Sequence, residues 1–168
     1  MHFKTSDLCD TFSQSLQICE PGFVSFGALT RFAGQISTIK CFEDNSLVRE
    51  AVGEPGLGRV LVVDAGASRR CAMLGDLLAA KAVDSRWSGV LLNGMIRDSV
   101  DIGTMPIGVK ALGTHPLKSV KKGVGERDVP VRFGGVEFVP GAYLYADEDG
   151  ILCSPAELPI GDGGAVSM

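Results

Sequence analysis

The amino-acid sequence predicts a single α/β domain with a mixed β-sheet, and three observations support this fold class. Short apolar runs typical of buried strands alternate with segments of helical periodicity. Two such runs, 129–133 and 136–139, are joined by Gly134 and Gly135, which is typical of a β-hairpin. The 168 residues are 45% hydrophobic and 21% charged, which is enough to bury one sizeable core.

The first part of the chain predicts two helices and two strands. Thr5, Ser6 and Asp7 carry side-chain oxygens that satisfy free N–H groups at a helix start, and residues 43–46 do the same before a second helix. A run rich in β-branched residues and a continuous apolar run have the composition of strands. We therefore expect helices at 5–13 and 46–52, strands at 34–42 and 59–64, and loops at 53–58 and 66–68. The small residues of the second loop would allow close approach to a ligand or form an ordinary turn.

The segment Met73–Val100 predicts a helix, a buried strand and a turn. Asp76 lies in the first turn of a helix whose apolar side chains recur at helical spacing, namely Leu74, Leu77, Leu78 and Ala82. The apolar run 89–92 predicts a strand that is buried on both faces and closed by a turn at Asn93 and Gly94.

Three charged side chains of this segment are expected to meet. Arg97 and Asp98 follow the end of the predicted strand, and Asp76 lies at a helix start. Ligands of open α/β sheets gather at the carboxyl ends of strands and at helix N-termini. The sequence therefore predicts one crevice that contains Asp76, Arg97 and Asp98.

The rest of the chain predicts further strands around a basic loop. We expect a brief helix that reaches Gly103 and strands at 107–112, 143–145 and 151–153. The loop 114–128 contains four cations that could meet a second substrate carboxylate or a macromolecular partner, although a solvated surface is the simpler reading: Lys118, Lys121, Lys122 and Arg127. We expect one domain over 1–160 and a flexible tail over 161–168.

Composition excludes several classes of function. The formal net charge of −4 argues against direct nucleic-acid binding by the whole protein. No apolar stretch approaches the ~20 residues that cross a bilayer, and the N-terminus lacks the apolar core of a signal peptide, so a cytoplasmic protein without membrane contact is expected. The five cysteines are scattered and odd in number, which indicates free thiols, and with two histidines a Cys/His zinc site is not expected.

Several segments resemble one family. GDLL, at Gly75–Leu78, precedes NGMIRD, at Asn93–Asp98, with twenty residues between Asp76 and Arg97. SDLCD, AGQISTIKCFEDNSLV, RVLVVDAGAS, GVKALGTHPLKS and VRFGGVEFVPGAYLYADEDGIL extend the likeness over residues 4–155. Together they resemble the 4-hydroxy-4-methyl-2-oxoglutarate aldolase family, whose relatives include the regulator of ribonuclease activity A. The resemblance implies a layered β/β/α swivelling-domain fold.

The resemblance also implies a site. Asp98 would bind a divalent cation, Mg²⁺ or Mn²⁺, and Arg97 would bind the carboxylate of a pyruvyl group. Gly75, Asp76, Leu77 and Leu78 would contact the substrate, with backbone N–H groups able to take oxyanion charge. We hypothesise that Asp76 orients a water on the cation for proton transfer. The alternative electron sink is a lysine Schiff base, for which Lys81 and Lys110 are the candidates, although neither has neighbours in the sequence that mark a lowered pKa.

The implied activity is a metal-dependent lyase. It would cleave 4-hydroxy-4-methyl-2-oxoglutarate, a 2-keto acid, to two pyruvates and decarboxylate oxaloacetate as a side activity, because both reactions form the same pyruvate enolate. The competing hypothesis is a protein-binding regulator of ribonuclease E, the function of the family's other branch, whose members lack the aspartate at the position of Asp98. A homotrimer or a dimer of trimers is implied by the resemblance alone.

Overall fold

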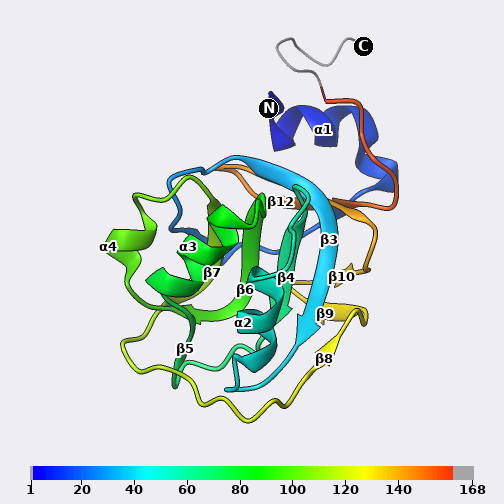
Figure 1. Cartoon of the computed structure of the whole chain (residues 1–168). Helices are drawn as coiled ribbons and strands as arrows, with labels where there is room; N and C mark the ends of the chain where they lie inside the picture. Colours follow the sequence, from blue (N-terminus) through cyan, green and yellow to red (C-terminus); the bar gives the residue numbers. More distant parts are fainter. Residues whose placement is uncertain (1, 161–168) are drawn as a thin grey trace.

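The computed structural model describes residues 2–160 and shows three layers, two of β-structure and one of helices (Figure 1). Four parallel strands form the middle layer. A parallel sheet is normally covered on both faces, which explains why these strands are continuous apolar runs in the sequence. In spatial order they are β3 (Phe32–Lys40), β4 (Val60–Asp64), β6 (Gly89–Ile96) and β7 (Gly108–Thr114). Three short strands extend this layer: β2 (Val24–Ser25) on β7, β5 (Ala72–Leu74) on β6 and β8 (Glu126–Arg127) on β3.

The second β layer is antiparallel and begins on the same long strand. β3 pairs in its first half with β11 (Tyr143–Ala146), which pairs with β12 (Ile151–Ser154), and β1 (Gln17–Ile18) closes that edge. A separate hairpin joins β9 (Val131–Phe133) to β10 (Val136–Phe138). The antiparallel layer and the hairpin both pack on the face of the middle layer that carries Val60, Val62 and Leu91.

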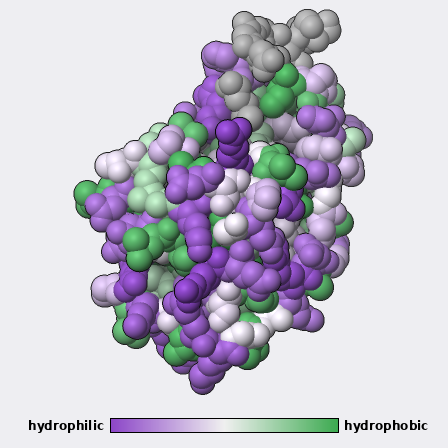
Figure 2. Space-filling view, viewed as in Figure 1, coloured by the Kyte–Doolittle hydropathy of each residue, from purple (hydrophilic) through white to green (hydrophobic). Residues whose placement is uncertain are grey.

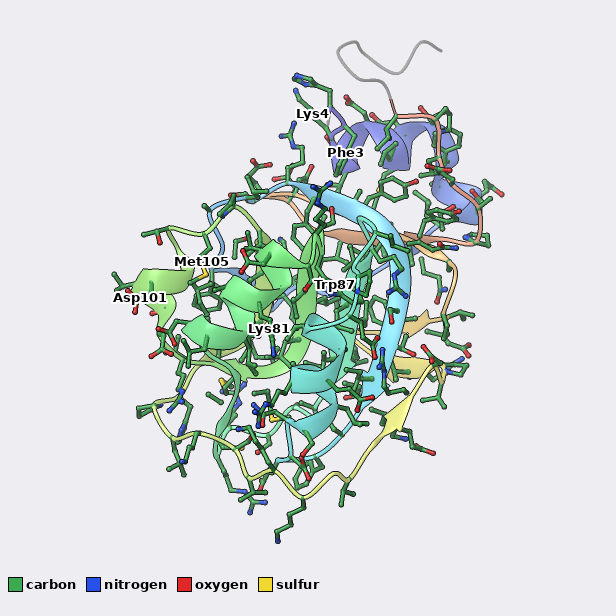
Figure 3. The ribbon with its side chains drawn as sticks, in the orientation of Figure 1. Phe3, Lys4, Lys81, Trp87, Asp101 and Met105 are labelled. Atoms are coloured by element: carbon green, nitrogen blue, oxygen red, sulfur yellow. The ribbon has the colours of Figure 1, made fainter. Side chains whose placement is uncertain are left out.

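The helices cover the opposite face of the middle layer. α2 (Ser46–Val52), α3 (Asp76–Asp84) and α4 (Ser99–Ile102) lie there, and a second apolar cluster joins them to the sheet. α1 (Thr5–Phe12) and the 3₁₀ turn η1 (Ser13–Ser15) lie apart from them, at the top of Figure 1. The segment before α1 is anchored by Phe3, whose ring centroid lies 5.7 Å from that of Tyr145 (Figure 3).

The predicted mixed α/β fold and most of its elements are confirmed. The sequence places these elements correctly: the helices α1 and α2, the strands β3, β4 and β7, the hairpin of β9 and β10, and the two last strands, β11 and β12. All five cysteines are free, and four of them are buried. The predicted tail, 161–168, lies outside the described residues. No helix in residues 2–160 is long and apolar enough to cross a membrane.

Two predictions in the central segment are wrong. β6 does not turn at Asn93 and Gly94 but continues to Ile96, because neighbouring strands hold it: Asn93 donates a hydrogen bond to Asp64 Oδ1 (3.0 Å). Gly94 serves close packing, since a Cβ there would lie 3.0 Å from that of Ala65. Leu74 is not helical either. It belongs to β5, which pairs with the end of β6, so its place in a helical apolar pattern was coincidental.

Candidate active site

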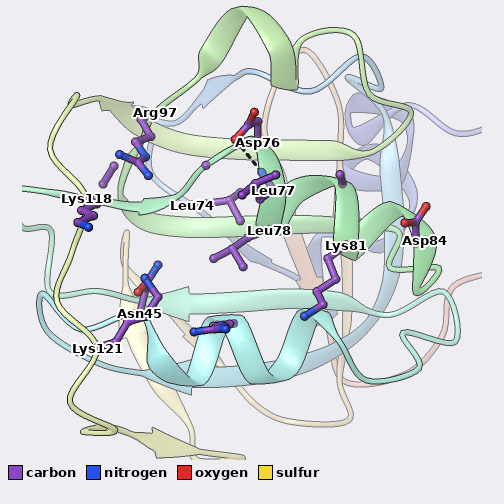
Figure 4. Close-up of a pocket in the computed structure, with 14 residues that line it drawn as sticks. Asn45, Leu74, Asp76, Leu77, Leu78, Lys81, Asp84, Arg97, Lys118 and Lys121 are labelled. Carbon is purple, nitrogen blue, oxygen red and sulfur yellow. Dashed lines mark hydrogen bonds between the residues drawn. The ribbon is translucent and has the colours of Figure 1, made fainter.

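A groove with a volume of about 480 Å³ lies between α3, α2 and the loop that follows β7 (Figure 4). Asp76, Arg97 and the residues Gly75, Leu77 and Leu78 all line it. Asp98, expected in the same crevice, does not line the groove but contacts the backbone of Asp76 and the side chain of Arg97. The surrounding face is mostly hydrophilic, with apolar side chains in separate patches (Figure 2). The groove is an accessible site at the edge of the helical layer, lined by apolar as well as charged side chains.

The charged residues at one end of the groove are placed by two parallel strands. β5 leads into α3, which begins at Asp76, and its neighbour β6 ends just before Arg97. Because carboxyl ends of parallel strands share one sheet edge, the two segments emerge side by side. Asp98 follows in the left-handed region, at φ 55° and ψ 41°.

Two carboxylates hold the start of α3. Asp98 Oδ2 accepts a hydrogen bond from the N–H of Asp76 (3.0 Å) and lies 3.9 Å from Arg97 Nε. Asp76 Oδ1 accepts one from the N–H of Leu77 (2.8 Å). The N–H groups of Asp76 and Leu77 are thus already bonded to carboxylates, whereas that of Leu78 meets no acceptor within residues 2–160. Fewer backbone donors are therefore available for the expected oxyanion role.

Gly75 has no side chain, and the side chains of Arg97 and Asp98 occupy the space where one would lie. Its backbone is extended, at φ −122° and ψ −171°, which any residue adopts. A Cβ there, however, would lie 2.8 Å from Asp98 Oδ2 and 3.2 Å from Arg97 Nε. Glycine is thus required by the space that the two charged groups occupy and not by the backbone.

Gly75→Ala is expected to lower the lyase activity that the family resemblance implies about tenfold or more, and to change the midpoint of thermal unfolding little. The added methyl displaces two flexible side-chain ends and no backbone, so the site distorts while the fold tolerates it. Steady-state kinetics and thermal unfolding of both proteins measure this. Equal activity in the variant would mean that the arrangement of Arg97 and Asp98 does not matter.

The opposite wall contains residues that sequence reasoning missed or underrated. Asn45 is buried, with an exposed fraction of 6%. Its Nδ2 donates a hydrogen bond to the carbonyl of Met73 (3.2 Å), and its Oδ1 has no hydrogen-bond partner within residues 2–160. Its place in a helix-capping segment gave no functional signal. Lys118 and Lys121 also line the groove, so this part of the basic loop is not merely solvated surface. Lys122 and Arg127 do not line it, and Arg127 forms two hydrogen bonds with Glu54 (2.6 and 3.0 Å).

Asp44 ties the loop of Lys118 and Lys121 to α2. Its Oδ2 accepts from the N–H groups of Lys122 (2.8 Å) and Val124 (3.1 Å), and its Oδ1 accepts from both the N–H and the hydroxyl of Ser46. Burial raises the pKa of this carboxyl, but the hydrogen bonds from Ser46, Val124 and Lys122 outweigh it and lower the pKa to about 2. Asp44 thus positions one wall of the groove.

Asp44 is expected to make the free energy of unfolding depend on acid pH. Its pKa is lower in the folded chain than the ordinary 3.8, so its stabilisation, about 2 kcal/mol, is complete above pH 4 and is lost as the pH falls through about 2. Urea unfolding between pH 2 and 7 should show this loss in the wild type and less of it in Asp44→Asn. Asp10→Asn, at an exposed site, is the control. Equal pH slopes in wild type and Asp44→Asn would contradict this role.

Other candidates lie away from the groove. The loop of residues 66–68 does not line it. Lys110 is buried, and burial lowers the pKa of its amine, contrary to the expectation from its sequence neighbours. Its Nζ donates to the carbonyl of Asp147 (2.6 Å), and it lines a different cavity of about 220 Å³. Lys81 is therefore the Schiff-base candidate that lies in the groove.

The donor set at Asp98 fits a hard, largely hydrated cation. Residues 2–160 contain no group of three or more His, Cys, Asp or Glu side chains that could hold a metal. Asp98 Oδ1 nevertheless has no protein donor in that range, and the backbone N–H of Asp76 bonds to the other oxygen, Oδ2. Mg²⁺ is commonly held by one or two carboxylates with several waters retained. The arrangement suits Mg²⁺ or Mn²⁺ and does not suit a closed structural zinc site.

The family is decided by a match that covers most of the chain. Residues 5–153 match the RraA-like family, described as Aldolase/RraA. The chain belongs to the RraA-like family. A Laribacter hongkongensis protein with the provisional name 4-hydroxy-4-methyl-2-oxoglutarate aldolase is 61% identical over 158 residues, which is 94% of this chain and 99% of that protein. A similarly named protein of Aromatoleum aromaticum is 55% identical over the same shares.

Two solved RraA-like structures share the fold. The RNA-processing inhibitor RraA from Thermus thermophilus is 46% identical, with a TM-score of 0.91 over 96% of this chain and 98% of that one. A Geobacillus kaustophilus protein described as an S-adenosylmethionine:2-dimethylmenaquinone methyltransferase is 53% identical, with a TM-score of 0.90 over 93% and 97%. The three activities named for these relatives differ, so the chemistry of the groove has to discriminate between them.

Proposed function

We propose that this RraA-like protein is a divalent-metal-dependent aldolase that cleaves 4-hydroxy-4-methyl-2-oxoglutarate to two molecules of pyruvate. The observation that carries the proposal is the contact of Asp98 with the N–H of Asp76 and with Arg97. Asp76 and Arg97 line a groove that five cations and two carboxylates share, and Asp98 lies beside it. Such a groove suits an anionic substrate, and its reacting end combines a carboxylate-binding group with a hard oxygen donor.

Each residue has a role that follows from its chemistry. The Arg97 guanidinium would bind the carboxylate of the pyruvyl half with two parallel hydrogen bonds. Asp98, with Oδ1 available, would hold Mg²⁺ or Mn²⁺, which when bound supplies Lewis-acid stabilisation of charge on the keto oxygen. Asp76 is fixed by its bond to Leu77 and would accept or return the proton of the 4-hydroxyl, directly or through a water. Gly75, Leu77 and Leu78 shape the adjoining wall.

Oxaloacetate decarboxylation is expected at the same site. Loss of carbon dioxide from oxaloacetate and cleavage of the aldol both leave negative charge on the pyruvyl fragment. Groups that stabilise this charge therefore accelerate both reactions. The two activities should fall together when Arg97 or Asp98 is changed.

Two other activities are tested against the same groove. S-adenosylmethionine is a sulfonium cation, which a groove rich in lysine and arginine would repel. Inhibition of a ribonuclease is the second candidate, and the similarity to the Thermus RraA favours it. The aspartate at position 98 favours the aldolase. Binding to ribonuclease E without any metal-dependent lyase activity would reverse this order.

A panel of 2-keto acids tests the proposal. The purified protein should release pyruvate from 4-hydroxy-4-methyl-2-oxoglutarate and from oxaloacetate when Mg²⁺ or Mn²⁺ is present, as followed by coupled oxidation of NADH by lactate dehydrogenase. Samples without protein correct for spontaneous decarboxylation. Absence of pyruvate release from every substrate with either metal would refute the aldolase.

The assembly remains a prediction of the family resemblance. We expect a homotrimer or a dimer of trimers on the strength of that resemblance alone. Size-exclusion chromatography with light scattering measures the mass directly. A mass near 17.7 kDa, that of one chain, at all concentrations would contradict this prediction.

A further inference from the structure

The groove contains more positive charge than the proposed chemistry uses. Arg97 serves the pyruvyl carboxylate, and Lys118 and Lys121 lie on the loop that faces it. Arg49 and Lys81 also line the groove, from α2 and α3. Neither forms a salt bridge within residues 2–160, in contrast to Arg127 and Arg70, which pair with glutamates elsewhere. These two exposed cations on facing helices are therefore available to bind an anionic ligand.

Lys81 lies at the end of the groove away from Arg97 (Figure 4). Lys81 extends from α3 toward α2 (Figures 3 and 4), and its Nζ lies 3.7 Å from where a Cβ on Gly53 would stand. Arg49 lies on α2 one turn before Gly53. Lys81 is five residues after Asp76, which corresponds to about 7.5 Å along the helix axis.

The stretch of α3 between Asp76 and Lys81 is long enough for the proposed substrate to lie along it. With carbon–carbon bonds of about 1.5 Å, the terminal carbons of a five-carbon dicarboxylate lie roughly 5 Å apart, and their oxygens farther. A substrate bound with its keto-acid end at Arg97 and its carbon chain along α3 would direct its other carboxylate toward Lys81 and the facing Arg49. Asp84, also in the lining, leaves this end with an excess of one positive charge.

We propose that Arg49 and Lys81 form a subsite for the carboxylate remote from the keto-acid end, and that they select substrates that carry a charged distal arm. The inference rests on the proposed aldolase function and adds the residues that determine its specificity. Both residues contact substrate and not the scissile bond, so their loss should raise KM more than it lowers kcat.

A matched pair of substrates tests the subsite. 4-Hydroxy-4-methyl-2-oxopentanoate has a methyl group where 4-hydroxy-4-methyl-2-oxoglutarate has its distal carboxylate, and cleavage of either releases pyruvate. The wild type should favour the dicarboxylate in kcat/KM. Arg49→Gln and Lys81→Gln should each reduce that preference about tenfold, mainly through KM, as expected for loss of a charge-assisted hydrogen bond.

The control and the outcomes separate this proposal from the proposed function. Lys122→Gln removes an exposed cation of the neighbouring loop that does not line the groove, and should leave the preference unchanged. If the wild type cleaves the dicarboxylate but the Arg49 and Lys81 variants keep its preference, the subsite is refuted and the aldolase stands. If Lys81→Gln abolishes cleavage of both substrates, Lys81 acts in the chemistry and the subsite is again refuted. If the wild type cleaves neither, the aldolase itself fails.

Discussion

Asp98→Asn is expected to lower lyase activity by about a thousandfold or more while the protein remains folded. Two features of the structure protect the fold. An asparagine oxygen can still accept the hydrogen bond from the N–H of Asp76 and so keep the start of α3 in place. Residue 98 adopts the left-handed conformation, which asparagine tolerates better than most residues. The loss should therefore report the missing charge alone.

Metal removal provides the matching measurement. Chelation of the wild type should abolish activity to a similar extent, and chelation of the variant should add little, because both changes remove the same cation. Mn²⁺ binding followed by electron paramagnetic resonance should weaken in Asp98→Asn. High Mn²⁺ should restore part of the rate, since a carboxamide oxygen is a weaker ligand for a hard cation. Circular dichroism checks that the fold is retained.

A Schiff-base enzyme would give the opposite result. It would remain active in chelator and would form a covalent adduct when pyruvate and borohydride are added together, with Lys81 the first place to look because it lies in the groove. Full activity of Asp98→Asn, or of the chelated wild type, would refute the role of Asp98.

Arg97→Lys is expected to reduce kcat/KM about 10- to 100-fold for pyruvyl substrates. Lysine keeps the charge but loses the planar fork that meets a carboxylate with two parallel hydrogen bonds. The residue is partly exposed, with 40% of its side chain accessible, so the fold should tolerate the change. Both 4-hydroxy-4-methyl-2-oxoglutarate and oxaloacetate should be affected alike, because both would present the same keto-acid end.

Kinetics of this variant need a matched control. Arg69→Lys makes the same substitution at an exposed position outside the groove and should leave kcat/KM unchanged. Thermal unfolding of both variants should stay close to that of the wild type. An Arg97→Lys enzyme with undiminished efficiency would remove Arg97 from the proposed site.

Local sequence was sufficient for the elements whose signal lies within a few residues. The apolar run of β4 is buried along its length, and the glycine pair at 134 and 135 makes the turn of the hairpin. Asp76, Arg97 and Asp98 could be placed together because each follows a predicted strand end or opens a helix, and the topology of parallel strands gathers such positions at one edge.

Where local patterns failed, pairing between distant segments decided the structure. Asn93 and Gly94 have turn composition but remain in β6, because β4 and its Asp64 are beside them. The short strands β1, β2, β5 and β8 have too few residues to show a period, and they exist because a longer strand offers free backbone groups alongside.

The sequence by itself thus determined the fold class and the family and indicated the proposed reacting end of the site, whereas the tertiary structure alone decided the rest of the groove. The other wall comes from two segments, α2 with the residue before it and the loop after β7. They meet only because α2 packs on the sheet and Asp44 bonds the loop to the start of α2; the residues concerned are Asn45, Arg49, Lys118 and Lys121. Their spacing along the chain is set by connections and not by a helical or strand period, so no pattern in the sequence relates them to Arg97.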